Sequence, residues 1–200
     1  MSTHFFGLKQ RAYSYSHSVG RNEFAGTGFR HPVDMAIGAD DTIYVVNRSR
    51  EDRRDGVRVS VVTLNEEYIT EFASFGEGDG QFVWPTSVAL DDRGNVYVAD
   101  EWLNRISVFN KDGEFLSKWG KAGSGDGELD RPAGLAIAGD TLFLTDSLNN
   151  RVQKFTLDGA YIGQFGGAGS GPGQFNMPWG ISLGQDGLVY VADWRNDRIQ

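Results

Sequence analysis

The chain has 200 residues, and its 40% hydrophobic and 12% aromatic content excludes intrinsic disorder. Its formal net charge of −8 opposes binding to nucleic acid and to anionic membranes, because like charges repel at long range. It contains no cysteine, which excludes disulfides, thiolate nucleophiles and zinc–thiolate sites.

One sequence pattern occurs four times along the chain. Each copy opens on a proline, continues with two short apolar runs separated by a turn, and reaches an Asp or Asn that precedes a polar loop. A third run leads to a fourth that ends in an aromatic residue and glycine, through an Asp-Gly turn in the second and third copies. Asp-Gly between such runs strongly predicts a hairpin, and no stretch shows sustained helical periodicity. Each copy is therefore predicted to be four antiparallel strands, and the copies open at Pro32, Pro85, Pro132 and Pro178.

The spacing of these prolines, 53, 47 and 46 residues, is typical of a β-propeller blade. The sequence therefore predicts an all-β fold: a single β-propeller domain of four-stranded antiparallel blades, with about three and a half blades present in an incomplete ring. In chain order, the predicted elements are a closing outer strand at 13–20, blade 1 at 32–76, blade 2 at 85–120, blade 3 at 132–166 and a partial blade 4 at 178–200.

The two ends of the chain carry separate expectations. Gly20 lies twelve residues before Pro32, the distance that separates the end of each later full blade from the next proline, so residues 13–20 are predicted to complete the last blade and close the ring. A four-bladed ring closed by this strand is the alternative. Because the sequence stops at Gln200 inside a third strand, we expect a fragment whose open edges bind remaining blades of the same chain or a second copy. The first 21 residues lack the apolar core of a signal peptide and no stretch is long enough to cross a bilayer, so a cytoplasmic location is expected if the N-terminus is genuine.

The repeats resemble the NHL repeat, whose usual phrase is Pro-x-Gly, an apolar strand, a turn, Val-Tyr-Val-Ala-Asp, then Asn and Arg-Ile. The fourth copy matches at Pro178, Gly180, Asp193, Asn196, Arg198 and Ile199, and the third at Pro132, Gly134, Asp146, Asn149, Arg151 and Val152. The second has Ser87 for the glycine and Leu103 for the asparagine, and the first has Asp34 and Asn47 and an insertion of mixed charge at 48–56. The resemblance implies part of a six-bladed propeller and predicts fold better than role, because propellers host many functions. The insertion is most simply a solvated loop.

An Asp five residues before an Arg recurs in the second, third and fourth copies. Both residues flank the loop after the second strand of a blade, so each pair can join across its loop or hold the loop backbone by charge-assisted hydrogen bonds. A catalytic residue is needed only once, whereas a residue pair that holds a loop in place is needed in every blade. We therefore predict structural ion pairs at Asp100–Arg105, Asp146–Arg151 and Asp193–Arg198.

Residues that do not repeat on the same loop face are the candidates for recognition. Four of the five tryptophans lie there, with arginine and histidine nearby, a composition found at the energetic centres of interfaces. The predicted ligand-binding residues are Trp84, Trp102, Trp179, Trp194, Arg131, Arg195 and His31. The competing interpretation is that each tryptophan packs between neighbouring blades. Trp102 and Trp194 are expected to be the most exposed.

The sequence predicts no catalytic residue, metal or cofactor. Its glycine-rich loops lie between strands with no helix to follow, which disfavours phosphate binding. Of the three histidines, only His31 lies at a blade opening. We therefore expect a non-catalytic binding or scaffold propeller that recognises a protein, peptide or glycan, with no nucleic-acid or membrane partner. The alternative is an enzyme of the amidating-lyase or lactonase type whose metal site is completed by missing blades.

Overall fold

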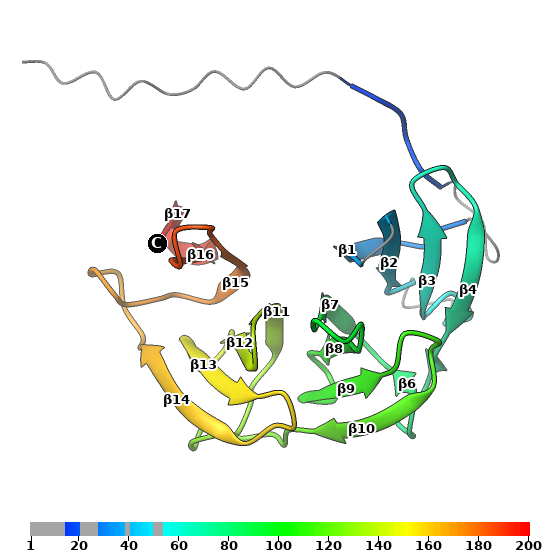
Figure 1. The fold of residues 1–200 in the computed structure, drawn as a ribbon. Helices are drawn as coiled ribbons and strands as arrows, with labels where there is room; N and C mark the ends of the chain where they lie inside the picture. The colour runs from blue at the N-terminus through cyan, green and yellow to red at the C-terminus, as the bar shows by residue number, and fades with distance from the viewer. Residues whose placement is uncertain (1–14, 21–27, 39–40, 50–53) are drawn as a thin grey trace, which may run out of the picture.

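The computed structural model of the protein describes residues 15–20, 28–38, 41–49 and 54–200. Four antiparallel sheets stand side by side around an open ring, as the radial arrangement in Figure 1 shows. The first strand of each sheet lies nearest the centre, and in the three four-stranded sheets the fourth strand lies at the rim. The predicted β-propeller with an incomplete ring is confirmed. Within the described residues, no helix has the length and apolar character needed to cross a membrane.

Each blade follows the chain from the centre outward. Blade 1 contains β1 (Pro32–Ile37), β2 (Thr42–Asn47), β3 (Arg58–Thr63) and β4 (Tyr68–Phe72). Blade 2 contains β7 (Pro85–Leu90), β8 (Val96–Asp100), β9 (Arg105–Phe109) and β10 (Phe115–Trp119). Blade 3 contains β11 (Pro132–Ala138), β12 (Thr141–Asp146), β13 (Arg151–Thr156) and β14 (Tyr161–Gly166). Blade 4 contains β15 (Pro178–Leu183), β16 (Val189–Asp193), the short 3-10 helix η2 (Trp194–Asn196) and β17 (Arg198–Ile199). Between blades 1 and 2, the short strands β5 (Ser74–Phe75) and β6 (Gln81–Phe82) form a parallel pair.

The hairpin turns use the residues that their geometry requires. Gly113 and Gly159 follow aspartates and take φ of 85° and 90°, a left-handed conformation that glycine adopts without strain. A Cβ on Gly113 would also lie 2.6 Å from the Phe72 ring of the preceding blade. The Asp-Gly turns therefore serve the hairpin and the contact between blades together.

In blade 2 the first turn is held by the side chain of Asp91. Its Oδ1 atom accepts the backbone N–H groups of Arg93 and Asn95 at 2.9 and 2.8 Å. The Tyr97 hydroxyl donates to Oδ2 at 3.2 Å. Burial of Tyr97, followed by the negative charge of Asp91 and this hydrogen bond, raises the pKa of the phenol to about 12.

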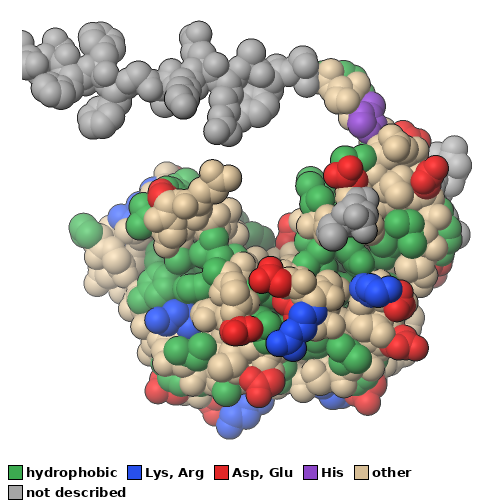
Figure 2. All heavy atoms as spheres, viewed as in Figure 1, with side chains coloured by type: hydrophobic (Ala, Val, Ile, Leu, Met, Phe, Trp, Pro, Cys, Tyr) green, Lys and Arg blue, Asp and Glu red, His purple; other side chains and the backbone are tan. Residues whose placement is uncertain are grey.

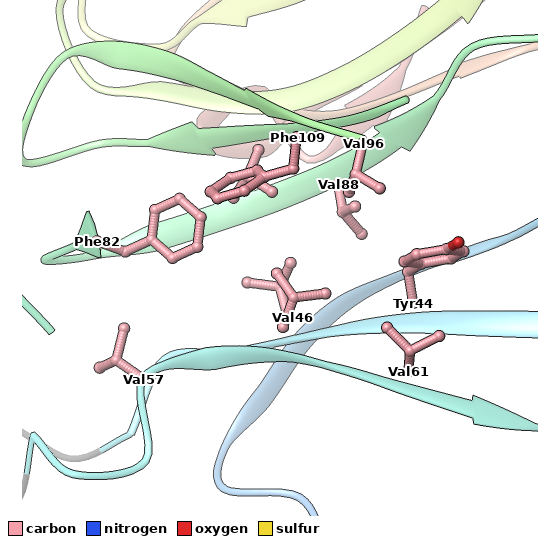
Figure 3. Packing of buried hydrophobic residues seen from close by; sticks show 10 residues of the cluster. Tyr44, Val46, Val57, Val61, Phe82, Val88, Val96 and Phe109 are labelled. Atoms are coloured by element: carbon pink, nitrogen blue, oxygen red, sulfur yellow. The ribbon is translucent and has the colours of Figure 1, made fainter. Parts of the chain in front are cut away.

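The hydrophobic core is divided among the spaces between neighbouring blades. Alternate residues of a strand face opposite sides of its sheet, so β2 directs Tyr44 and Val46 toward blade 2. There they join Phe82, Val88 and Phe109 in the cluster drawn in Figure 3. Equivalent apolar clusters fill the spaces between blades 2 and 3 and between blades 3 and 4. Blades 2 and 3 are thus covered by a neighbouring blade on both faces, and blades 1 and 4 on one face.

The two end blades border the opening of the ring. Tyr190 of blade 4 is 42% exposed, whereas Tyr97, at the same repeat position but covered by blade 3, is 3% exposed. Figure 2 shows hydrophobic side chains on both sides of the opening. The alternative of a closed four-bladed ring is therefore wrong for this structure.

The N-terminal segment leaves the closing-strand prediction open. Residues 15–20 adopt no strand, and residues 13 and 14 lie outside the described residues. Val19 packs against Ile43, Val45 and Val62, which cover the face of blade 1 turned away from blade 2. The His17 side chain lies 2.7 Å from the Leu64 carbonyl oxygen through its Nε2 atom.

Blades are also joined by hydrogen bonds near the start of each inner strand. Asn104 and Asn150 follow their repeat aspartates by four residues and take φ of 51° and 54°. Their Oδ1 atoms accept the N–H groups of Arg131 and Met177 at 2.8 and 2.9 Å, directly before the next blade. Asp197 has the same position and a φ of 51° at the open side of blade 4.

Candidate functional site: the loop face

The loop after the second strand of blade 3 is held by one buried carboxylate. Asp146 is fully buried, and its Oδ1 atom accepts the backbone N–H of Asp130 at 2.7 Å. Its Oδ2 atom accepts three side-chain hydrogen bonds, from Asn149 Nδ2, Arg151 Nε and Gln153 Nε2, at 2.9, 2.8 and 2.9 Å. The predicted Asp146–Arg151 ion pair is formed, within a network that also includes an asparagine and a glutamine.

Blade 4 builds the same network around Asp193. Its Oδ2 atom accepts hydrogen bonds from Asn196 Nδ2, Arg198 Nε and Gln200 Nε2 at 2.9, 2.8 and 3.2 Å. Burial of the Asp193 carboxyl acts to raise its pKa, but the backbone N–H of Asn176 and these side-chain donors outweigh burial and lower it. The Asp193–Arg198 ion pair is therefore formed as predicted, at 2.8 Å.

In blade 2 the predicted Asp100–Arg105 ion pair is not formed. Both oxygens of the buried Asp100 carboxylate accept backbone N–H groups of the loop, from Val83, Trp84, Trp102 and Leu103. The Arg105 guanidinium instead donates to three backbone carbonyls of the connection between blades, those of Glu77, Gly78 and Gln81. Leu103 and Ser107 stand where blades 3 and 4 have asparagine and glutamine. Among the described residues, Arg105 Nε and Ser107 Oγ are buried without a hydrogen-bond partner.

Blade 1 holds its loop with an amide instead of a carboxylate. Asn47 accepts the backbone N–H of Arg30 at 2.8 Å and donates to Ser60 Oγ at 3.1 Å. Arg58, the arginine of this copy, donates to the same Ser60 oxygen and pairs with Glu71 at 3.1 Å. The recurring polar residues therefore fasten loops in all four blades, by three different sets of contacts.

Two of the tryptophans meet between blades 1 and 2. The rings of Trp84 and Trp102 pack edge to face, with centroids 5.5 Å apart and an interplanar angle of 71°. The guanidinium of Arg48 lies 4.5 Å above the Trp84 ring and forms an ion pair with Glu101. Trp102 is 57% exposed. The rings border a cavity of about 280 Å³, lined by Arg48, Arg54, Val57, Phe75, Val83, Trp84 and Trp102.

Arg54 lines the same cavity from the insertion. Its guanidinium lies 4.5 Å above the Phe75 ring, and among the described residues it forms no ion pair and no hydrogen bond. The sequence predicted a solvated loop for residues 48–56. Arg54 and Asp55 are exposed, but the guanidinium groups of Arg48 and Arg54 also stack on the rings of Trp84 and Phe75. Residues 50–53 lie outside the described residues. Sequence reasoning missed Arg48, Arg54 and Phe75, although five arginines between 48 and 58 were a visible signal.

The other two tryptophans meet on blade 4. The Trp179 and Trp194 rings pack edge to face with centroids 6.0 Å apart, and the Arg195 guanidinium lies 5.4 Å from the Trp194 ring centroid. They border an open cavity of about 730 Å³, which is lined by Trp179, Gly180, Ala192, Asp193, Trp194, Asp197, Arg198 and Ile199. The residues at the repeat position of Trp179 in blades 2 and 3, Thr86 and Ala133, are buried. The exposure of Trp179 therefore arises from its place beside the opening of the ring.

The two remaining predicted binding residues are set apart from these cavities. His31 and Arg131 directly precede the first strands of blades 1 and 3, where they take φ of 49° and 55°. Neither lines the cavity of Trp84 and Trp102 or that of Trp179 and Trp194. In the part of the chain that the structure describes, no group of three or more His, Asp or Glu side chains is placed to hold a metal ion.

Four radially arranged antiparallel sheets, with a polar network fastening each blade loop, define a β-propeller protein. The NHL-repeat family model matches residues 82–109 and 175–200, which cover parts of blades 2 and 4. The chain thus contains NHL repeats within a β-propeller fold, as the sequence resemblance predicted. No curated protein matches it significantly.

Several solved structures share the fold. Virginiamycin B lyase from Staphylococcus aureus aligns with a TM-score of 0.61 and 17% identity over 89% of this chain and 52% of the lyase. A streptogramin B lyase aligns with a TM-score of 0.62 and 16% identity over 86% of this chain and 51% of the lyase. Hydrazine synthase from Kuenenia stuttgartiensis aligns with a TM-score of 0.60 and 17% identity over 90% of this chain and 50% of that protein. The chain spans about half the length of these structures, and at such identities the likeness shows the fold alone.

Proposed function

We propose that this chain is a non-catalytic binding propeller that recognises a protein, peptide or glycan through the tryptophans of its loop face. The observation that supports this proposal is the exposure of Trp102 and Trp194, at 57% and 54%, beside arginines that stack on tryptophan rings. Tryptophan is highly buried on average, so exposed tryptophan rings next to arginine side chains are typical of a recognition surface.

The physical basis of recognition is the chemistry of these two groups. An indole ring offers a large rigid apolar surface and loses little conformational entropy on binding, while arginine adds directed hydrogen bonds. The rings are already oriented by their edge-to-face contacts, so a ligand would meet a preformed surface.

The proposal is tested by screening the chain on peptide and glycan arrays, followed by Trp102→Ala and Trp194→Ala. Since both rings are largely exposed, at least one variant should lose ligand binding while its melting temperature stays within about 2 °C of the parent. A Trp119→Ala variant is the contrast, because that ring packs against Phe155 at 4.9 Å and its loss should lower the melting temperature. If the arrays retain no ligand, or if binding and melting temperature fall together in both variants, the proposal is wrong.

A lyase-type activity is the second candidate, favoured by the likeness in fold to two lyases. Cleavage of virginiamycin B by the purified chain would support this candidate against the binding proposal.

A further inference from the structure

The cavity between blades 1 and 2 has the composition of a site for a small ligand that carries one negative charge beside an apolar group. We propose that it binds the C-terminal residue of a peptide, with the terminal carboxylate on Arg54 and an apolar side chain against Trp84 and Trp102. This inference rests on the proposed binding function and names the class of ligand for one of its two tryptophan pairs. Three features of the cavity support it: its charge, its lining and its size.

Among the described residues that line the cavity, the Arg54 guanidinium is the one cation without an ion-pair partner. Arg48 is neutralised by its ion pair with Glu101, whereas the Arg54 guanidinium contacts the Phe75 ring and has no anionic partner among the described residues. A guanidinium presents parallel N–H donors that match the two oxygens of a carboxylate. A ligand with a single negative charge would therefore complete the electrostatic balance of the cavity, and a doubly charged phosphate would exceed it.

The lining of the cavity requires an apolar group beside that charge. Five of the seven lining side chains are apolar: Val57, Phe75, Val83, Trp84 and Trp102. A bare inorganic anion would leave these surfaces without contacts, and a neutral apolar group would leave Arg54 without a partner. Because the whole chain carries a net charge of −8, attraction of an anion must come from this local contact and not from the long-range field.

The size of the cavity limits the ligand to about one residue. Its volume of about 280 Å³ lies at the lower end of the range for small-molecule sites, too small for several side chains. The C-terminal residue is the place in a peptide where an apolar side chain and a carboxylate share one carbon atom. Capture of a terminal carboxylate is also an established mode of peptide recognition in other folds.

The experiment compares N-acetyl-L-phenylalanine with N-acetyl-L-phenylalaninamide, which differ only in the carboxylate. Binding to the full 200-residue chain is followed by the NMR signals of the tryptophan indole N–H groups and by calorimetry. The acid should shift the signals of Trp84 and Trp102 and bind at least about tenfold more tightly than the amide. Arg54→Gln should remove this preference, so that acid and amide bind with similar weak affinity.

Matched controls separate the site from the other tryptophan pair. Arg195→Gln removes an arginine that, like Arg54, stacks on an aromatic ring, in this case Trp194 of blade 4, and should leave binding of the acid unchanged. Inorganic phosphate at the same concentration should not displace the acid. Melting temperatures of both variants should match the parent, because Arg54 and Arg195 lie outside the strands.

The inference is overturned by any of three results: equal affinity for acid and amide, unchanged acid binding in Arg54→Gln, or displacement of the acid by inorganic phosphate. After any of these results, array ligands that still bind to the parent and to Arg54→Gln would leave the proposed function intact. Conversely, acid binding that depends on Arg54, with no ligand retained on the arrays, would keep this assignment and reject the broader function.

Discussion

Gln153 and Ser107 occupy the same position of the repeat and should respond very differently to replacement by alanine. Both are fully buried. The Gln153 amide accepts the N–H of Gly127 at 3.0 Å and donates to the Glu128 carbonyl at 2.7 Å and to the Asp146 carboxylate at 2.9 Å. The Ser107 hydroxyl has no hydrogen-bond partner among the described residues.

The expected loss of stability follows from these contacts. A neutral hydrogen bond contributes about 0.5–1.5 kcal/mol, and one to a charged group about 1.5–3 kcal/mol. The side-chain entropy released when glutamine is removed offsets about 1.5–2 kcal/mol of this total. At the centres of these ranges, Gln153→Ala should therefore lower the free energy of unfolding by about 2.5 kcal/mol, while Ser107→Ala should change it by less than about 0.5 kcal/mol.

The assay is urea unfolding followed by tryptophan fluorescence for the parent and both variants at neutral pH. With an m-value of about 2 kcal/mol/M, the midpoint of Gln153→Ala should fall by about 1–2 M and that of Ser107→Ala should not move. If Ser107→Ala costs as much as Gln153→Ala, or if neither has an effect, the polar network around Asp146 does not stabilise the blade loop and the reasoning fails.

Four further outcomes are expected. Since the folded-state pKa of Tyr97 is raised to about 12 from 10.0, stability should be constant below pH 10 and fall between pH 10 and 12, and urea midpoints of Tyr97→Phe should lack this fall. Because the pKa of Asp193 is lowered from 3.8, stability should decrease as the pH drops below about 4, and Asp193→Asn should flatten that acid limb. Gly134→Ala should cost about 1–3 kcal/mol in urea unfolding, because its Cβ would lie 2.6 Å from the Trp179 carbonyl oxygen, while Gly180→Ala, whose Cβ meets nothing closer than 3.6 Å, should be near neutral. Sedimentation should show self-association of the chain that Ile199→Lys reduces; a parent that is already a monomer at every concentration would contradict this.

The blades were predictable because their signals are local. The proline spacing, the Asp-Gly turns and the alternating strands each depend on a few neighbouring residues, so the sequence was sufficient for the fold. The Asp146–Arg151 pair was predictable for the same reason. The identical spacing of Asp100 and Arg105 led to the wrong prediction of an ion pair in blade 2. In blade 3 the side chains of Asn149 and Gln153 also donate to the Asp146 carboxylate, and blade 2 has neither asparagine nor glutamine at these two positions.

The candidate site was harder to predict because it is assembled across blades. Trp84 and Trp102 were chosen as residues that do not repeat, but their edge-to-face contact depends on how the loops of blade 2 fold. The stacking of Arg48 and Arg54 depends on the angle between blades 1 and 2, which no local pattern encodes. The prediction of a solvated insertion holds for the exposed Arg54 and Asp55, but it left out this stacking, which arises because guanidinium groups bind readily to aromatic faces.

The hydrogen bonds that Asn104 and Asn150 accept from the backbone before the following blade couple a sheet only to its immediate neighbour. An arc joined in this way has the energetics of a linear array, in which every unit is stabilised by the interfaces on its two sides. Blades 2 and 3 have two such interfaces, and blades 1 and 4 have one each. Fraying should begin at the two outer units and advance inward, so amide hydrogens of β8 and β12 should exchange with solvent last.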